Sequence, residues 1–252
     1  MTLRWEPEGE ARGSVALVHG VMALAETWWR IGAALAARGW RVAAVDLPGH
    51  GGDVRRDGAL DLDALVDGVA ARLDGPVDLL VGHSLGAIVA LGLLGRDPGA
   101  ARALVLEEPP GPSAIDLGAL AEVIVHDAAA VRTDRAPLVA REREANPGWH
   151  PGDVERSVRG IEEADSDAIV AALNGSLRWD LAALFAGVDA PALVVAAPDA
   201  PGRFPLDPGS ALRGADREAV RAALAPERFA VLEGGHCLHR DDPRRWIEVV
   251  DG

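Results

Sequence analysis

One short stretch, LLVGHSLGAIVAL at residues 79–91, constrains the fold of this chain most. An apolar strand pattern runs into Gly82, Ser84 and Gly86, and small and apolar residues follow at helical spacing. Glycines two positions before and after Ser84 leave room for a backbone turn that is too tight for side chains. The pattern therefore predicts a strand, a sharp turn that exposes one hydroxyl, and a helix.

Alternation of strands and helices continues along the rest of the chain. Apolar strand patterns occur at residues 15–18, 42–45, 77–82, 103–106, 192–197 and 229–232. Strands that alternate with helices favour an α/β fold, with a mostly parallel sheet and helices on both faces. The segment 109–184 has no strand pattern and is rich in Arg, Glu and Ala. We therefore expect a core domain from residues 1–108 and 185–252 and a helical cap inserted at 109–184.

Composition excludes several classes of function. The 252 residues carry a formal net charge of −14, which disfavours binding to nucleic-acid phosphates. All 25 basic residues are arginine, so no lysine can form a Schiff base. The lone Cys237 cannot close an internal disulfide, and no Cys/His cluster has metal-ligand spacing. No apolar run approaches the ~20 residues of a membrane span. We expect a cytoplasmic protein with no metal, cofactor, membrane or nucleic-acid partner.

Ser84 is the candidate nucleophile. Ligands of parallel α/β sheets bind at the carboxyl ends of the strands, and a G-x-S-x-G sequence between strand and helix fits a nucleophile elbow. The backbone N–H of Leu85 is expected to form half of an oxyanion hole, and that of Val21, after the first strand, the other half. A glycine-rich turn with an uninvolved serine is the alternative interpretation.

A serine hydroxyl near neutral pH needs a general base, and the base needs a carboxylate. His236 is favoured as the base because a Gly-Gly loop places it just after the last strand, and His239 is the second candidate. Asp199, which follows the strand at 192–197, is favoured as the acid. Glu107 and Glu108, at the end of the preceding strand, stay open as alternative acids.

Four segments in order, VHG, DLPGHG, GHSLG and GGHCLHRDDP, make the chain similar to the α/β-hydrolase superfamily. The resemblance is to its small, cofactor-independent, esterase-like members with a helical cap. It implies that Ser84 is the nucleophile, His236 the base and Asp199 the acid, with oxyanion donors at Val21 and Leu85.

The sequence departs from the family at AAPDAPG, where the glycine of the usual G-x-x-D is missing before Asp199. In some relatives the acid instead ends the strand that here carries Glu107 and Glu108, so these alternatives remain open.

The expected function is that of a serine hydrolase of carboxylesterase type, which cleaves a small-molecule ester, lactone or thioester through an acyl-enzyme on Ser84. Met22 and Trp149 are expected to line the substrate pocket. A C–C bond hydrolase or an acyltransferase with the same triad, or a ligand-binding protein with low turnover, are the alternatives. The sequence leaves the substrate and the oligomeric state open.

Overall fold

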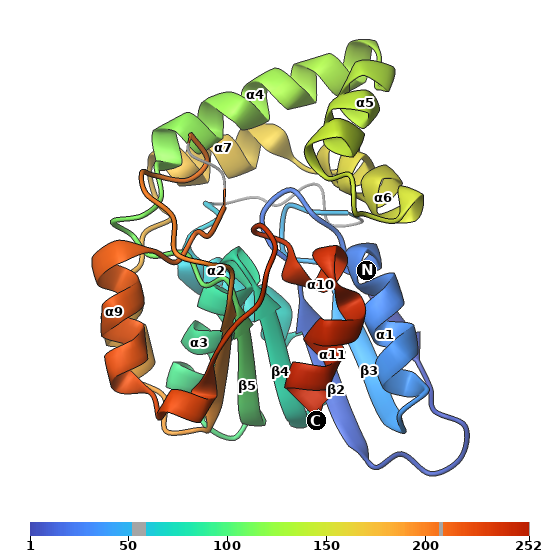
Figure 1. Ribbon diagram of the computed structural model, residues 1–252, viewed down its shortest axis with the longest axis vertical. Helices are drawn as coiled ribbons and strands as arrows, with labels where there is room; N and C mark the ends of the chain where they lie inside the picture. The colour runs from blue at the N-terminus through green and yellow to red at the C-terminus, as the bar shows by residue number, and fades with distance from the viewer. Residues whose placement is uncertain (52–58, 207–208, 252) are drawn as a thin grey trace.

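The computed structural model describes residues 1–51, 59–206 and 209–251, and a seven-stranded sheet forms its centre (Figure 1). In sheet order the strands are β1 (Thr2–Trp5), β3 (Trp40–Val45), β2 (Gly13–Val18), β4 (Val77–His83), β5 (Ala101–Glu107), β6 (Ala192–Ala196) and β7 (Phe229–Val231). Every neighbouring pair is parallel except β1 and β3. The predicted mostly parallel sheet is confirmed. The sequence pattern did not predict β1, because four residues at a sheet edge show too little periodicity.

Helices cover both faces of this sheet, as predicted. One face carries η1 (Ala25–Trp28), α1 (Trp29–Ala36) and α11 (Pro243–Asp251). The other carries α2 (Leu62–Ala70), α3 (Leu85–Arg96), α8 (Leu181–Ala186) and α9 (Gly214–Ala223). The short helices η2 (Pro226–Arg228) and α10 (Leu238–Asp241) flank β7 and the loop that follows it. None of the described helices is long and apolar enough to cross a membrane.

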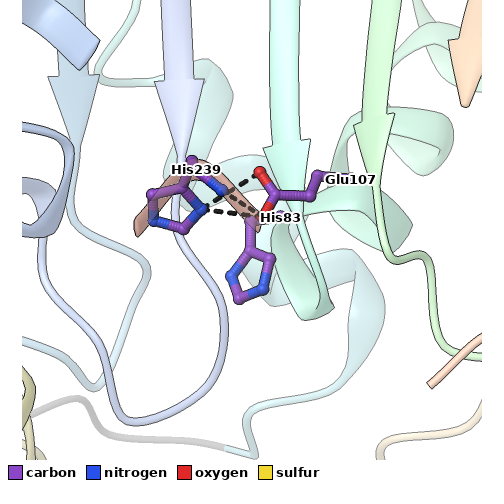
Figure 2. Close-up of side chains that lie close together, drawn as sticks. All are labelled: His83, Glu107 and His239. Atoms are coloured by element: carbon purple, nitrogen blue, oxygen red, sulfur yellow. Dashed lines mark hydrogen bonds and ion pairs between the residues drawn. The ribbon is translucent and has the colours of Figure 1, made fainter. Parts of the chain in front are cut away.

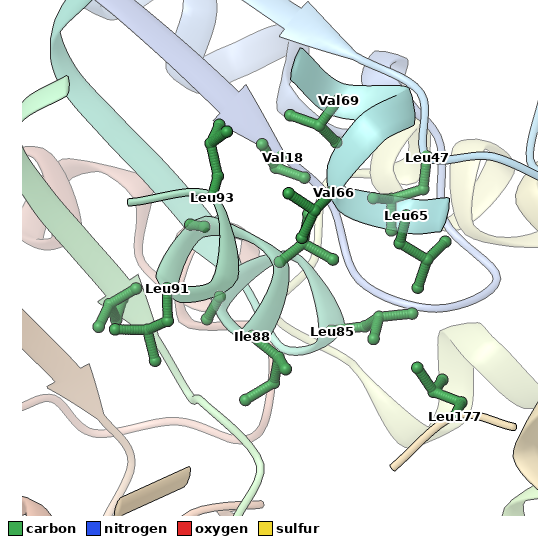
Figure 3. Close-up of a cluster of buried hydrophobic side chains, with 14 of the residues drawn as sticks. Val18, Leu47, Leu65, Val66, Val69, Leu85, Ile88, Leu91, Leu93 and Leu177 are labelled. Carbon is green, nitrogen blue, oxygen red and sulfur yellow. The ribbon is translucent and has the colours of Figure 1, made fainter. Parts of the chain in front are cut away.

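Helix α3 is apolar on all sides, and it is buried between the sheet and the helices α2 and α8. Figure 3 shows Leu85, Ile88 and Leu91 of α3 in the same apolar cluster as Val66 of α2. Burial of one such side chain stabilises a fold by about 1.5–3 kcal/mol. The core therefore fixes the first turn of α3, which begins directly after Ser84.

Four helices lie above the carboxyl edge of the sheet (Figure 1): α4 (Leu117–Thr133), α5 (Ala136–Ala145), α6 (Pro151–Glu162) and α7 (Ser166–Asn174). They fall within the segment predicted as a cap, 109–184. Helix α8 straddles the predicted boundary at residue 184 and packs against α3 of the core. Residues 52–58, 207–208 and 252, which belong to the predicted core segments, lie outside the described residues.

Polar contacts join the cap to the core. The indole N–H of Trp29 donates to Asp153 Oδ1 over 2.7 Å. Arg159 donates from both Nη atoms to the carboxylate of Glu26, over 2.7 and 2.8 Å. Paired Arg–carboxylate contacts of this kind fix orientation as well as distance. The cap is therefore held at a defined position over the end of the sheet.

Candidate active site

Ser84 is the single residue between the end of β4 and the start of α3, and its backbone lies at φ 52° and ψ −120°. This turn requires that the residues two positions before and after Ser84 have no side chain. A Cβ on Gly82 would lie 2.4 Å from the carbonyl oxygen of Gly86, and one on Gly86 would lie 2.4 Å from that of Val18. A non-glycine residue at positive φ costs about 1–3 kcal/mol, a strain that clusters at functional sites.

Two backbone amides lie beside this serine. Leu85 opens α3, and the loop after β2 passes so close that a Cβ on Gly20 would lie 3.0 Å from Cβ of Ser84. Within the described part of the chain, the N–H groups of Leu85 and Val21 donate to no protein group. The next amide, on Met22, donates to His50 Nε2 over 3.0 Å and holds the loop in place.

The loop that follows β7 carries His236, and its imidazole contacts a carboxylate. Nδ1 of His236 lies 3.3 Å from Oε2 of Glu108. His83, next to Ser84 in the chain, supports this loop because its Nε2–H donates to the carbonyl oxygen of His236 over 2.8 Å. Burial, followed by the nearby imidazole of His236, lowers the pKa of His83 well below its ordinary value. His83 is therefore neutral and has a single N–H, which this bond uses.

Glu108 is fully buried, and its carboxylate accepts from three further donors. These are the N–H of Ala197 at 2.7 Å, the hydroxyl of Ser210 at 2.7 Å and the N–H of Ala211 at 2.5 Å. The β4–β5 register pairs His83 with Glu107, so Glu108 lies one position beyond the strand, beside Ser84. Its positive φ of 51° turns the chain at this point.

Asp199 does not face His236, which differs from the expectation that it is the acid. Its side chain is exposed, and its Oδ1 accepts from the N–H groups of Ala200 at 3.0 Å and Gly214 at 3.3 Å. Two residues before Asp199, the N–H of Ala197 donates to Glu108, so Glu108 takes the place beside the end of β6 that was expected for Asp199. Of the three candidate acids, the structure brings Glu108 to His236, and the sequence signal for it was its place at the end of β5.

The third candidate, Glu107, pairs with the second candidate base, His239 (Figure 2). Glu107 Oε1 accepts from Nδ1 of His239 over 2.8 Å and from its backbone N–H over 3.2 Å. The ring of His239 stacks on Trp28 with centroids 4.2 Å apart, and both side chains of the pair are buried. His239 therefore belongs to the support beneath the site.

Ligand atoms of His83, Glu107 and His239 all lie within 4.8 Å of one another, as a metal site would require. Their hydrogen bonds already explain the cluster. His83 donates to His236 O, and His239 donates from Nδ1 to Glu107 while its Nε2 faces the Nε–H of Arg240 at 3.3 Å. We assign no metal to these residues.

A cavity of about 600 Å³ lies between the core and the cap, and Ser84 and His236 both line it. Val21, Leu85, Met22 and Trp149, the other predicted site residues, line it as well. Apolar side chains form much of its wall, namely Ile115, Leu120, Ile124, Leu173, Leu177 and Phe204. Its charged lining residues are Asp127, Glu142, Arg240 and Asp241. Cavities of this size and composition bind small molecules.

A serine at positive φ at the end of a central parallel strand, beneath helices inserted after the next strand, is typical of the α/β-hydrolase fold. The sequence profile of the Alpha/beta hydrolase family matches residues 15–249, and the chain belongs to this family.

Several of the relatives are esterases and lipases. The chain is 36% identical over 183 residues to lipase LipV of Mycobacterium tuberculosis, covering 70% of this chain and 64% of the lipase. It is 33% identical over 171 residues to a pimeloyl-[acyl-carrier protein] methyl ester esterase of Neisseria meningitidis, covering 62% of this chain and 52% of that protein. The aligned parts span between 25% and 66% of the lengths of these esterases and lipases.

An esterase from Exiguobacterium antarcticum has a similar fold, with a TM-score of 0.75 at 17% identity over 99% of this chain and 93% of that chain.

Proposed function

We propose that this protein is a serine hydrolase of carboxylesterase type, in which Ser84, His236 and Glu108 form the catalytic triad. The observation that carries the proposal is the strained Ser84 turn, which lines one cavity together with a histidine whose Nδ1 faces a buried carboxylate. Relatives named as esterases and lipases support ester hydrolysis as the type of reaction.

In the proposed reaction, Ser84 Oγ attacks the acyl carbonyl while Nε2 of His236 takes the hydroxyl proton. The N–H groups of Val21 and Leu85 donate to the negative oxygen of the tetrahedral intermediate. His236 then returns the proton to the leaving alcohol, and an acyl-enzyme remains on Ser84. A water molecule, deprotonated by His236, attacks this ester and releases the acid.

Glu108 acts through His236 in this mechanism. Its Oε2 accepts from Nδ1–H, so Nε2 is left as the basic nitrogen of a residue that lines the cavity. The three other donors on Glu108 hold the carboxylate in one orientation. We propose Glu108 as the acid in place of Asp199, which is exposed and bonded to its own loop.

The substrate is proposed to be a small ester, lactone or thioester, with Met22 and Trp149 among the residues that contact it. A cytoplasmic location stays a prediction from the sequence.

Hydrolysis of p-nitrophenyl butyrate by the wild type and by Ser84→Ala tests the proposal. We expect the variant to lose at least about a thousandfold in kcat, because the nucleophile is gone. Full activity in Ser84→Ala would overturn the assignment. Hydrolysis of a vinylogous C–C substrate, with no turnover of any ester, would instead favour a C–C hydrolase.

A further inference from the structure

Arg240 lies on α10, four residues after His236, and lines the cavity that holds Ser84. The residue is only 4% exposed. Its Nε–H donates to Nε2 of His239 over 3.3 Å, which fits the His239 tautomer that donates from Nδ1 to Glu107. The guanidinium carbon lies 4.9 Å from the ring centroid of Trp149, another cavity residue. The side chain is therefore fixed at the wall of the cavity.

The guanidinium of Arg240 has no counter-ion among the residues that the structure describes. Across residues 1–51, 59–206 and 209–251, no carboxylate forms an ion pair with it, and neither of its Nη atoms donates a hydrogen bond. A buried charge without a partner is strongly unfavourable. The fold therefore keeps a cation at the substrate cavity whose two outer nitrogens are free to bind a ligand.

Acidic residues of the same cavity are, by contrast, supplied with donors. Asp127 accepts two hydrogen bonds from Arg141, over 2.7 and 2.6 Å. Asp241 accepts from the Trp149 indole over 2.6 Å and from the Gly235 N–H over 2.7 Å. Glu142 lies 3.4 Å from the hydroxyl of Ser157. The acidic groups of the cavity thus have hydrogen-bond donors, whereas neither Nη atom of Arg240 has an acceptor among the described residues.

We propose that Arg240 binds a carboxylate of the substrate, so that the preferred substrates are esters whose chain ends in a carboxylate. The inference rests on the proposed serine hydrolase function and deepens it. A planar guanidinium presents two parallel N–H donors, which match the two oxygens of a carboxylate. The apolar wall suits the methylene chain that joins this carboxylate to the ester. Because the chain has a net charge of −14, acidic side chains are in excess, and a buried arginine that pairs with none of the described ones is a specific sign of a ligand site.

Paired substrates test the proposal: mono-p-nitrophenyl adipate, which ends in a carboxylate, and p-nitrophenyl hexanoate, which does not. We expect the wild type to have the higher kcat/KM for the adipate ester. Arg240→Met should lower the ratio of kcat/KM for the adipate ester to kcat/KM for the hexanoate ester by about 10- to 100-fold, because a charge-assisted hydrogen bond is lost. The same ratio in Arg240→Lys should fall between those of the wild type and Arg240→Met. Arg156→Met is the matched control, because Arg156 also stacks on a tryptophan, Trp29, but does not line this cavity. An unchanged ratio in Arg240→Met, or a wild type that prefers hexanoate, would overturn the proposal.

Calorimetric titration with adipate, suberate and neutral hexanediol separates this proposal from the proposed reaction, because binding requires no turnover. We expect a dicarboxylate to bind the wild type at least about tenfold more tightly than Arg240→Met, and hexanediol to bind neither. Binding of neither dicarboxylate would overturn the proposal even if Ser84 hydrolyses esters. Tighter binding of inorganic phosphate than of both dicarboxylates would overturn the carboxylate assignment. Dicarboxylate binding without any ester hydrolysis would overturn the proposed reaction alone.

Discussion

Replacing Glu108 by glutamine is the substitution that tests the proposed triad most sharply. The carboxylate accepts from His236 Nδ1, the Ala197 N–H, the Ser210 hydroxyl and the Ala211 N–H. Glutamine keeps the shape but offers one acceptor oxygen and one NH2 donor. Either orientation of the amide sets its NH2 against at least one group that can only donate.

The magnitude follows from these contacts. Where the NH2 faces Nδ1, the imidazole of His236 favours the tautomer in which Nε2 carries the hydrogen and cannot take the proton of Ser84. In either orientation, the negative charge that stabilises the imidazolium is lost. A change of this kind in another serine hydrolase lowers kcat by about 10⁴-fold, and we expect Glu108→Gln to lose about 10³- to 10⁴-fold. Each buried donor left without an acceptor costs about 1–3 kcal/mol, so the variant should also unfold at a lower temperature.

Asp199→Asn is the matched control for this test. Asp199 is exposed and, among the described residues, accepts from the nearby N–H groups of Ala200 and Gly214, which an asparagine oxygen can replace. We expect its kcat on p-nitrophenyl butyrate to stay within about twofold of the wild type, because the side chain does not contact His236. A loss of several orders of magnitude in Asp199→Asn, with near-normal turnover in Glu108→Gln, would refute the assignment.

Three further predictions concern strain, pH and the cap. Ser84→Gly should abolish hydrolysis and raise the free energy of unfolding by about 1 kcal/mol in urea titrations, because glycine relieves the positive φ. Burial lowers the pKa of His50 to about 4 and of His19 to about 3, below the value near 6.5 of an unfolded histidine. Below about pH 6.5 the unfolded chain therefore binds more protons than the folded chain. The contribution of each histidine to the free energy of unfolding is complete above that pH and is lost as the pH falls. Between about pH 7 and pH 5 we expect the free energy of unfolding to fall by about 2 kcal/mol for each histidine. A urea midpoint at pH 5 equal to that at pH 7 would contradict this. Trp149→Phe removes the N–H that Asp241 accepts, and should lower Tm by about 2–4 °C and raise KM.

The sequence was sufficient where the structure depends on local geometry. The turn at Ser84 could be predicted because its two glycines and the following helix are adjacent in the chain, and the Gly-Gly loop in the same way led to His236 as the proposed base. The choice of a carboxylate for His236 depends on how β5 and β6 align, since Glu108 meets Ala197 and Ala211 only after the strands pair. Sequence spacing does not contain that register.

Arg240 gave no sequence signal for a similar reason. Its significance lies in the carboxylates that do not contact it, and a missing contact is visible only in three dimensions. The antiparallel edge strand β1 and the packing of α8 on α3 likewise depend on neighbours that are distant in the chain.

Labelling with a fluorophosphonate, followed by mass spectrometry of the arginine-cleaved peptide 73–96, tests the central claim most directly. An activated serine attacks the phosphorus of this reagent, whereas an ordinary serine hydroxyl does not. We predict one stable adduct on Ser84 in the wild type, slow labelling in Glu108→Gln and normal labelling in Asp199→Asn. An unmodified peptide 73–96 from the folded wild-type protein would contradict the account.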